Sequence, residues 1–365
     1  MLLENTSIVA SSNRRVNNFD GLRLLGALAV LVGHAYVLTG NGPPASVLGI
    51  RIDALGVAVF FSISGYLIAV SWMRNPRLLS FFRHRALRIF PALLVVLVVT
   101  TFVVGPFSTT LSTGSYFRSG ETWQYTGLSA ILLAQYHLPG VFTGISHVTS
   151  AVNGSLWTLG VEFSCYCAVA VAGLVLRARA GIAFVVMAAI GVLLTAVEHG
   201  PNAAKAVADG APVIVYFAVG ALIAILLQKT EIRARWAILV AAVWACAYLL
   251  WPEAALPFSW LALPWCVIAL GRSSTPVFRR ASKFGDLSYG IYLWAFVVQQ
   301  VVVDRFGRLP VGLDILIVGL IAAGLAFVSW RLIESRALAF KDGRMRRREE
   351  NEATPEPAPT FNSAR

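Results

Sequence analysis

Long apolar runs separated by short polar stretches make up most of this 365-residue chain. A helix needs about 20 apolar residues to cross the hydrocarbon core of a bilayer, and ten of the runs are close to that length. They cover residues 21–39, 52–72, 86–105, 155–176, 181–197, 211–228, 235–251, 255–271, 286–304 and 313–333. The pattern therefore predicts an all-α, polytopic membrane helix bundle of about ten transmembrane helices.

The longest loop, residues 106–154, contains a shorter apolar segment at 125–138. That segment is too short to span a bilayer, so we expect it to be interfacial or re-entrant. The loop is also rich in aromatic residues: Tyr116, Trp123, Tyr125 and Tyr136. Their rings could stack on sugars, but an aromatic belt at the membrane surface has the same composition.

The basic residues indicate the orientation of the bundle. With the N-terminus inside, ten spans place five basic residues in or beside outer loops: Arg51, Arg118, Lys205, Arg305 and Arg308. The other 25 of the 30 Lys and Arg residues lie on the inner side, which is the usual bias of membrane proteins. We therefore predict that both termini are cytoplasmic and that the protein lies in the cell (inner or plasma) membrane.

The composition agrees with this topology. The chain is 57% hydrophobic and only 13% charged, whereas a soluble protein carries about 25% charged residues. Topology and attraction to anionic lipid account for the net charge of +12, so no nucleic-acid partner is expected. Residues 1–18 are predicted to be a cytoplasmic segment, 19–340 the membrane domain and 341–365 a disordered tail. The four cysteines lie in apolar runs and are interpreted as packing residues, with neither a disulfide nor a metal site.

The first span carries ionisable residues at a regular spacing, in the segment DGLRLLGALAVLVGHA that starts at Asp20. Arg23 and His34 are eleven residues apart, which is three helical turns plus roughly 20°, so both lie on one helix face about 16 Å apart. Asp20 is three residues before Arg23 and is expected to pair with it. Arg23 could instead extend to the inner headgroups, but an intramembrane histidine usually indicates function.

Three later segments add candidate residues. Ser62, Ser64 and Gly65 favour close helix packing over a serine nucleophile. Arg83, Arg85 and Arg88 start the third span, and the last two share a helix face that could bind phosphate or simply anchor the helix. Glu162 lies within the fourth span and is expected to pair with a histidine or an arginine, because a lone carboxylate is costly there.

Five ordered motifs resemble the acyltransferase 3 family of integral-membrane acyltransferases over about residues 17–340. They are FDGLRxxxAxxVxxxHA at 19–35, GVxxFFxISGYL at 56–67, FxxRxxRIxP at 82–91, SLWTLxxEF at 155–163 and LSYxIYL at 287–293. The chain departs from the family pattern at Trp294, where many members carry histidine, and at Ser335, which follows Glu334.

The resemblance implies transfer of an acyl group, usually acetyl, from cytoplasmic acyl-CoA to a hydroxyl of a cell-surface or exported polysaccharide or glycolipid. By the same resemblance, His34 is the catalytic histidine, with Arg23 as its motif arginine and Asp20 beside it. Glu162 and Tyr289 line the site, and Arg85 and Arg88 receive the CoA phosphates. We group Arg83, Ser64 and Tyr289 with the donor-binding residues.

The residues leave two mechanistic roles open for His34. A neutral imidazole could take the proton of the acceptor hydroxyl as a general base, or it could take the acyl group itself. Arg23 is too far along the helix to touch the same carbonyl, so we give it a donor-binding or structural role.

The alternative is a membrane transporter or flippase for a glycan or an anionic small molecule. Such proteins also bury charged residues in many spans. They commonly show related halves or broken helices near the middle of the membrane, and the sequence shows neither.

Overall fold

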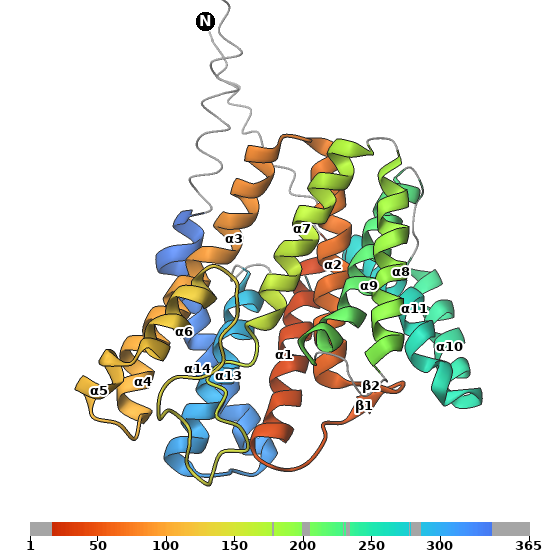
Figure 1. Ribbon diagram of the computed structural model, residues 1–365. Coiled ribbons are helices and arrows are strands. Elements are labelled where there is room, and N and C mark those ends of the chain that lie inside the picture. The colour runs from red at the N-terminus through yellow and green to blue at the C-terminus, as the bar shows by residue number, and fades with distance from the viewer. Residues whose placement is uncertain are drawn as a thin grey trace, which may run out of the picture.

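The computed structural model describes residues 17–176, 179–198, 205–228, 230, 234–276, 278 and 286–337. Apolar helices form a bundle that runs between two ends of the molecule (Figure 1). Seven stretches are long and apolar enough to cross a membrane within the described part of the chain. Their main helices are α1 Phe19–Leu38, α2 Ile52–Arg74, α3 Leu78–Val99, α7 Trp157–Val175, α11 Ala255–Arg272, α13 Leu287–Phe306 and α14 Val311–Ser329.

Three further helices occupy the other predicted spans: α8 Ala180–Glu198, α9 Lys205–Leu226 and α10 Arg235–Leu250. Where their side chains are described, their apolar stretches are Ala180–Thr195, Pro212–Leu226 and Arg235–Leu250. The predicted all-α membrane bundle is therefore confirmed, while the count of ten spans and the orientation of the termini stay predictions.

The remaining elements are short and lie mostly between α1 and α2 or between α3 and α7. A two-residue antiparallel pair, β1 Ser46–Val47 and β2 Ile50–Arg51, precedes α2. The π-helical turn η1 Thr100–Val104 continues α3 into α4 Gly105–Ser108, and α5 Thr113–Arg118 and α6 Gly120–Ala130 follow. A 3-10 turn, η3 Pro252–Ala254, precedes α11, and a second π-helical turn, η5 Trp330–Glu334, follows α14.

The third span begins earlier than the predicted residue 86. It forms one continuous helical stretch, Leu78–Ser108, because α3 starts soon after the Asn75–Pro76 break that ends α2. Phe81 in its first turns packs edge-on against Trp72 of α2, with ring centroids 5.1 Å apart. Arg83, Arg85 and Arg88 therefore lie well inside the helix and at its contact with neighbouring helices.

Glycines let the central helices approach closely. A Cβ on Gly56 of α2 would lie 2.4 Å from the carbonyl oxygen of Gly26 on α1. A Cβ on Gly65 would lie 2.0 Å from the carbonyl oxygen of Phe217 on α9. The interpretation of the Ser62–Gly65 segment as a close-packing surface is thus confirmed, because α1, α2 and α9 approach one another closely at these glycines.

The long loop before α7 folds against α13. Gln300 donates to the carbonyls of Thr149 (2.9 Å) and Ala151 (2.6 Å), and Asn153 donates to the carbonyl of Leu293 (3.0 Å). His147 contacts the Gln300 side chain at 3.0 Å. The apolar segment 125–138 begins in α6 and continues as irregular chain, and no candidate membrane span covers it among the described residues. It does not form a span, as expected, and its interfacial or re-entrant placement stays a prediction.

The loop aromatics differ in exposure. Tyr116 and Tyr125 are fully buried, and the Tyr116 hydroxyl donates to the carbonyl of Thr101 at 3.0 Å. These two rings therefore cannot stack on a sugar. Trp123 is exposed and packs near Phe102 and Phe117, as expected for an interfacial belt residue.

We expect Gly56→Ala to destabilise the protein by about 1–3 kcal/mol, because the added methyl group collides with the backbone of α1. The matched control is Gly319→Ala on α14, where a Cβ meets nothing within 4 Å. Alanine is the better helix former, so this control should leave stability unchanged or raise it by up to about 1 kcal/mol. Thermal unfolding in detergent measures both, and equal effects of the two variants would contradict the packing argument.

Reporter fusions test the predicted topology. A reporter that works only in the cytoplasm should be active when it is fused after residue 365, because an even number of spans returns the chain to the side of its N-terminus. Activity of an exported reporter at that position would contradict the ten-span topology.

Candidate functional site

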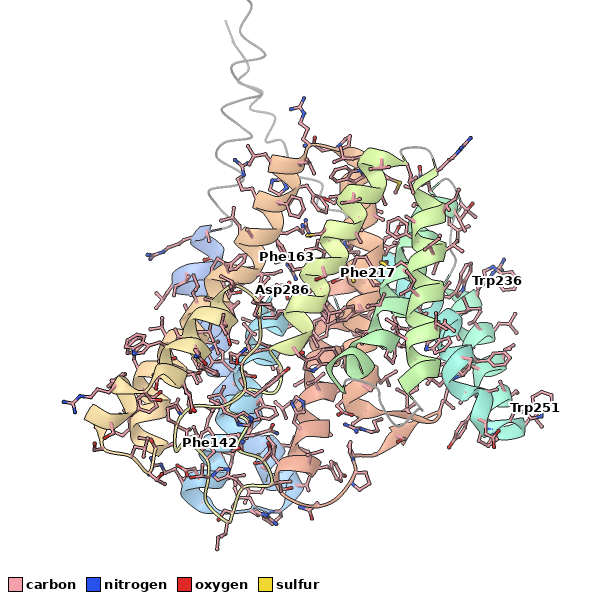
Figure 2. The ribbon with its side chains drawn as sticks, in the orientation of Figure 1. Phe142, Phe163, Phe217, Trp236, Trp251 and Asp286 are labelled. Carbon is pink, nitrogen blue, oxygen red and sulfur yellow. The ribbon has the colours of Figure 1, made fainter. Side chains whose placement is uncertain are left out.

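An ionic cluster surrounds Asp286, the residue before α13. The Arg88 guanidinium of α3 donates to its carboxylate at 2.5 Å, and Arg23 of α1 approaches the same oxygen at 3.9 Å. Arg23 also pairs with Asp20 at 3.8 Å, as the spacing on α1 predicted. Figure 2 shows Asp286 inside the outline of the bundle, away from both ends. The cluster thus ties three helices together through one carboxylate.

The charge state of Asp286 follows from these contacts. Arg88 donates to one carboxylate oxygen and Arg23 approaches the same oxygen, while the Ser288 hydroxyl donates to the other at 2.5 Å. Two cations and a hydroxyl donor favour the ionised carboxyl, which in turn offsets the charge of the two buried arginines.

Tyr289 and Glu334 lie beside this ionic cluster. The Tyr289 hydroxyl donates to the carbonyl of Ile89 on α3 at 2.9 Å. Glu334 is buried in the π-helical turn η5 and accepts from Ser329 at 2.9 Å. Both residues face a very small cavity that Arg88 and Asp286 also line.

Two arginines on α3 have less complete bonding than Arg88. The Nε atoms of Arg83 and Arg85 are buried and have no hydrogen-bond partner among the described residues. Arg85 is near enough to Arg88, Tyr166 and Glu162 to interact with them electrostatically. An anion that reached this position would meet donors that the protein itself does not satisfy.

Glu162 of α7 bonds to hydroxyl groups and not directly to a histidine or an arginine as expected. Its carboxylate accepts from Ser64 of α2 at 2.6 Å and from Tyr166 at 2.5 Å. Arg85 and Arg88 act on Glu162 only at longer range. Hydroxyl donors suffice for the carboxylate here because two short hydrogen bonds replace its hydration.

His34 lies apart from these groups, toward the other end of α1. Its ring meets Phe296 of α13 edge-on, with centroids 5.0 Å apart. Its Nδ1 is buried and has no hydrogen-bond partner in the described part of the chain. Asp53 and Arg51, at the start of α2, are near enough to interact with it electrostatically.

The structure therefore divides the predicted site residues into two groups. Arg23 and Arg88 meet at Asp286, and Asp20 pairs with Arg23. Ser64 and Glu162 bond to one another. His34 contacts none of them directly, which agrees with the separation of about 16 Å that helical geometry gives between Arg23 and His34.

Two carboxylates of the site, Asp286 and Asp53, were not among the predicted residues. The sequence contains only 18 acidic residues, and these two lie in or beside apolar runs. An acid in that position is costly unless it is paired, so its presence was a usable signal.

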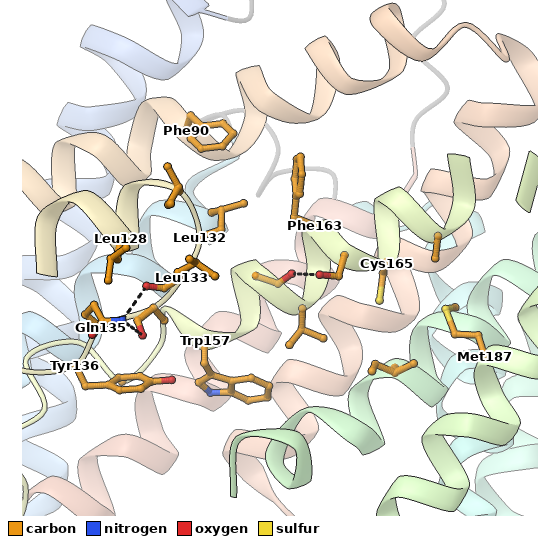
Figure 3. A pocket seen from close by; sticks show the side chains of 18 of the residues that line it. Phe90, Leu128, Leu132, Leu133, Gln135, Tyr136, Trp157, Phe163, Cys165 and Met187 are labelled. Atoms are coloured by element: carbon orange, nitrogen blue, oxygen red, sulfur yellow. Dashed lines mark hydrogen bonds between the residues drawn. The ribbon is translucent and has the colours of Figure 1, made fainter. Parts of the chain in front are cut away.

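A large groove lies between α3, the 131–136 segment, α7, α8 and α9 (Figure 3). Its volume is about 1430 Å³, and its walls are mostly apolar. Trp157 and Tyr136 lie close together along one side, next to the Gln135 amide that donates to two backbone carbonyls. None of the predicted site residues lines this groove. The described residues also hold no cluster of three or more His, Cys, Asp or Glu side chains suited to a metal ion.

Comparison with known proteins agrees with the ordered motifs. The family profile described as "Acyltransferase domain" matches residues 16–333. The chain is 31% identical to a protein named "O-acetyl transferase" of Shigella phage Sf6, across 88% of this chain and 96% of that protein. It is 30% identical to "Nodulation protein 10" of Rhizobium leguminosarum bv. viciae, across 93% of this chain and 97% of that protein. No solved structure matches the chain.

The match covers the whole helix bundle, including α1 with His34 and α3 with its arginines, and the apolar helices make the chain a multi-pass membrane protein. The chain belongs to the acyltransferase 3 family of membrane acyltransferases.

Proposed function

We propose that this protein is a membrane O-acyltransferase that uses cytoplasmic acyl-CoA, with acetyl as the expected group, and modifies a hydroxyl of an exported or cell-surface glycan or glycolipid. The observation that carries the proposal is the arrangement along α1. Arg23 and Arg88 meet at Asp286 near one end of the helix, and Arg85, whose Nε has no partner among the described residues, is near enough to Arg88 to interact with it. His34, whose Nδ1 has no hydrogen-bond partner among the described residues, lies toward the other end. The name of the phage relative, "O-acetyl transferase", supports an acetyl group.

CoA suits this arrangement because its phosphates and its thioester lie at opposite ends of a long, flexible arm. Arg83 and Arg85 would bind phosphate through charge-assisted hydrogen bonds. Arg88 already holds Asp286, so it would contribute charge and would position α3 against α13. The thioester could then approach His34 while the phosphates stay on α3.

The reaction needs a proton to move as the new bond forms. His34 as general base takes the proton of the acceptor hydroxyl, whose oxygen attacks the thioester carbonyl. The carbon–sulfur bond then breaks, and the imidazolium returns the proton to the departing thiolate of CoA. If His34 takes the acyl group first, the reaction has two transfers. The imidazole attacks the thioester and releases CoA, and the acceptor hydroxyl then takes the acyl group from the acyl-imidazole.

His34→Ala should lower the rate of acyl transfer by roughly 10²-fold or more, because the general base is lost. Membrane insertion and stability should stay intact, because the side chain makes no hydrogen bond through Nδ1. Glycan mass spectrometry on a deletion strain, complemented with wild type or variant, measures the acyl group per repeat. Transfer of labelled acetate from acetyl-CoA in isolated membranes gives the rate. Full activity in the variant would overturn the role of His34, and movement of unmodified acceptor without label would favour the transporter.

Arg85→Ala should raise the KM for acyl-CoA by roughly 10- to 100-fold and change the acceptor KM little, since one charge-assisted contact to phosphate is lost. The matched control is Arg88→Ala, which leaves Asp286 with one partner fewer and should lower the unfolding temperature as well. Equal effects of Arg85→Ala on both substrates would mean that this arginine only anchors the helix.

A further inference from the structure

Asp53 is an ionisable residue that the fold buries at the start of α2. It lies in the first turn of α2, and its side chain is only 12% exposed although it is ionisable. It packs against Gly33, the residue before His34, so closely that a Cβ on Gly33 would lie 2.4 Å from the Cβ of Asp53. The helix crossing therefore fixes this carboxylate beside the turn of α1 that carries His34.

The Asp53 carboxylate is held from the other side by Arg51 of β2. The Arg51 Nε donates to Oδ1 at 3.1 Å, and a second nitrogen of the guanidinium donates to Oδ2. The Arg51 side chain is 55% exposed, so this cation lies at the rim while the carboxylate lies inside. A carboxylate has about four lone-pair positions, so it can accept from the guanidinium and from one further donor.

His34 has a nitrogen that lacks a partner on this side of the bundle. Its Nδ1 is buried without a hydrogen bond, and Asp53 is near enough to act on the ring electrostatically. From α13 the ring of Phe296, which cannot titrate, meets the imidazole edge-on. From α14, Asp314 reaches α1 indirectly, through Gln299 and the carbonyl of Leu31. Asp53 is thus the carboxylate best placed to receive an N–H from His34.

We propose that Asp53 is the positioning residue of His34: in the reacting state it accepts a hydrogen bond from Nδ1–H, which leaves the lone pair of Nε2 for the acceptor hydroxyl. The inference rests on the proposed function and adds to it a residue outside the motifs that identify the family. Fixing Nδ1–H selects one tautomer and one ring orientation, and the negative charge stabilises the imidazolium that forms when the hydroxyl proton is taken. The bond forms by rotation of the imidazole and leaves the pair of Arg51 with Asp53 in place.

The test compares Asp53→Asn with Arg51→Gln, because both substitutions remove the Arg51–Asp53 ion pair and only the first removes the carboxylate. Asp53→Asn should lower kcat on the order of 10²- to 10⁴-fold and leave the KM for acyl-CoA within about threefold. The acid limb of its residual pH profile should move to lower pH, because the imidazolium loses its stabilising charge. Arg51→Gln should lose far less kcat and should move that limb to higher pH, because an opposing cation is gone.

Amounts in the membrane and unfolding temperatures of both variants show whether either one fails to fold. Equal losses of kcat in the two variants, or wild-type kcat in Asp53→Asn, would overturn the role of Asp53. Asp53→Glu provides a second variant, which should recover part of the lost rate if the carboxylate matters and none if only shape does. His34→Ala is measured in the same series. An active His34→Ala variant would contradict the proposed function at His34 itself. An inactive His34→Ala variant beside a fully active Asp53→Asn variant would contradict only the role of Asp53.

Discussion

The cost of placing charge inside a membrane bundle controls how this protein is organised. Asp286 offsets the charge of two buried arginines, since Arg88 donates to its carboxylate at 2.5 Å and Arg23 approaches it at 3.9 Å. These arginines come from α3 and α1, and Asp286 leads into α13. One carboxylate therefore fixes the relative positions of three helices. Removing it would leave Arg88 without its ion-pair partner and would leave Arg23 with Asp20 alone. The neighbouring contacts, from Tyr289 to α3 and from Ser64 to Glu162, depend on that arrangement.

The same constraint explains why the polar groups separate along α1. Between Arg23 and His34 the helix presents only Leu, Ala, Val and Gly, and several of these residues are fully buried against α2 and α13. A charged group in that interval would need a partner that the tight Gly26–Gly56 crossing leaves no room for. The charged residues therefore lie near the N-terminal end of the helix, and the imidazole, a group that can remain neutral, lies farther along it. This order matches a donor with anionic phosphates at one end and a neutral thioester at the other.

The length of the apolar runs was sufficient to predict the long helices of the bundle and their order along the chain. It was not sufficient to predict the start of the third span at Leu78 or the short helices α4 to α6. The shared face of Asp20, Arg23 and His34 was predicted from helical spacing alone, and the Asp20–Arg23 pair confirms part of it. The partners across helices could not be predicted in this way. Glu162 bonds to Ser64, which is 98 residues away, and Arg88 bonds to Asp286, which is 198 residues away. Spacing on one helix carries no information about such contacts, because packing between helices decides them.

In the proposed reaction acyl transfer competes with hydrolysis, so the surroundings of His34 would have to keep water away from the reacting carbonyl. The loop before α7 bears on this proposal through its contacts with α13. Gln300 and Asn153 bind the loop to α13, and Gly154 comes so close to Phe296 that a Cβ there would lie 2.5 Å from the ring. Phe296 is the ring that meets His34 edge-on. The loop thus packs against the apolar ring that covers the imidazole, and in the proposed reaction the acceptor hydroxyl would take the place of water beside His34.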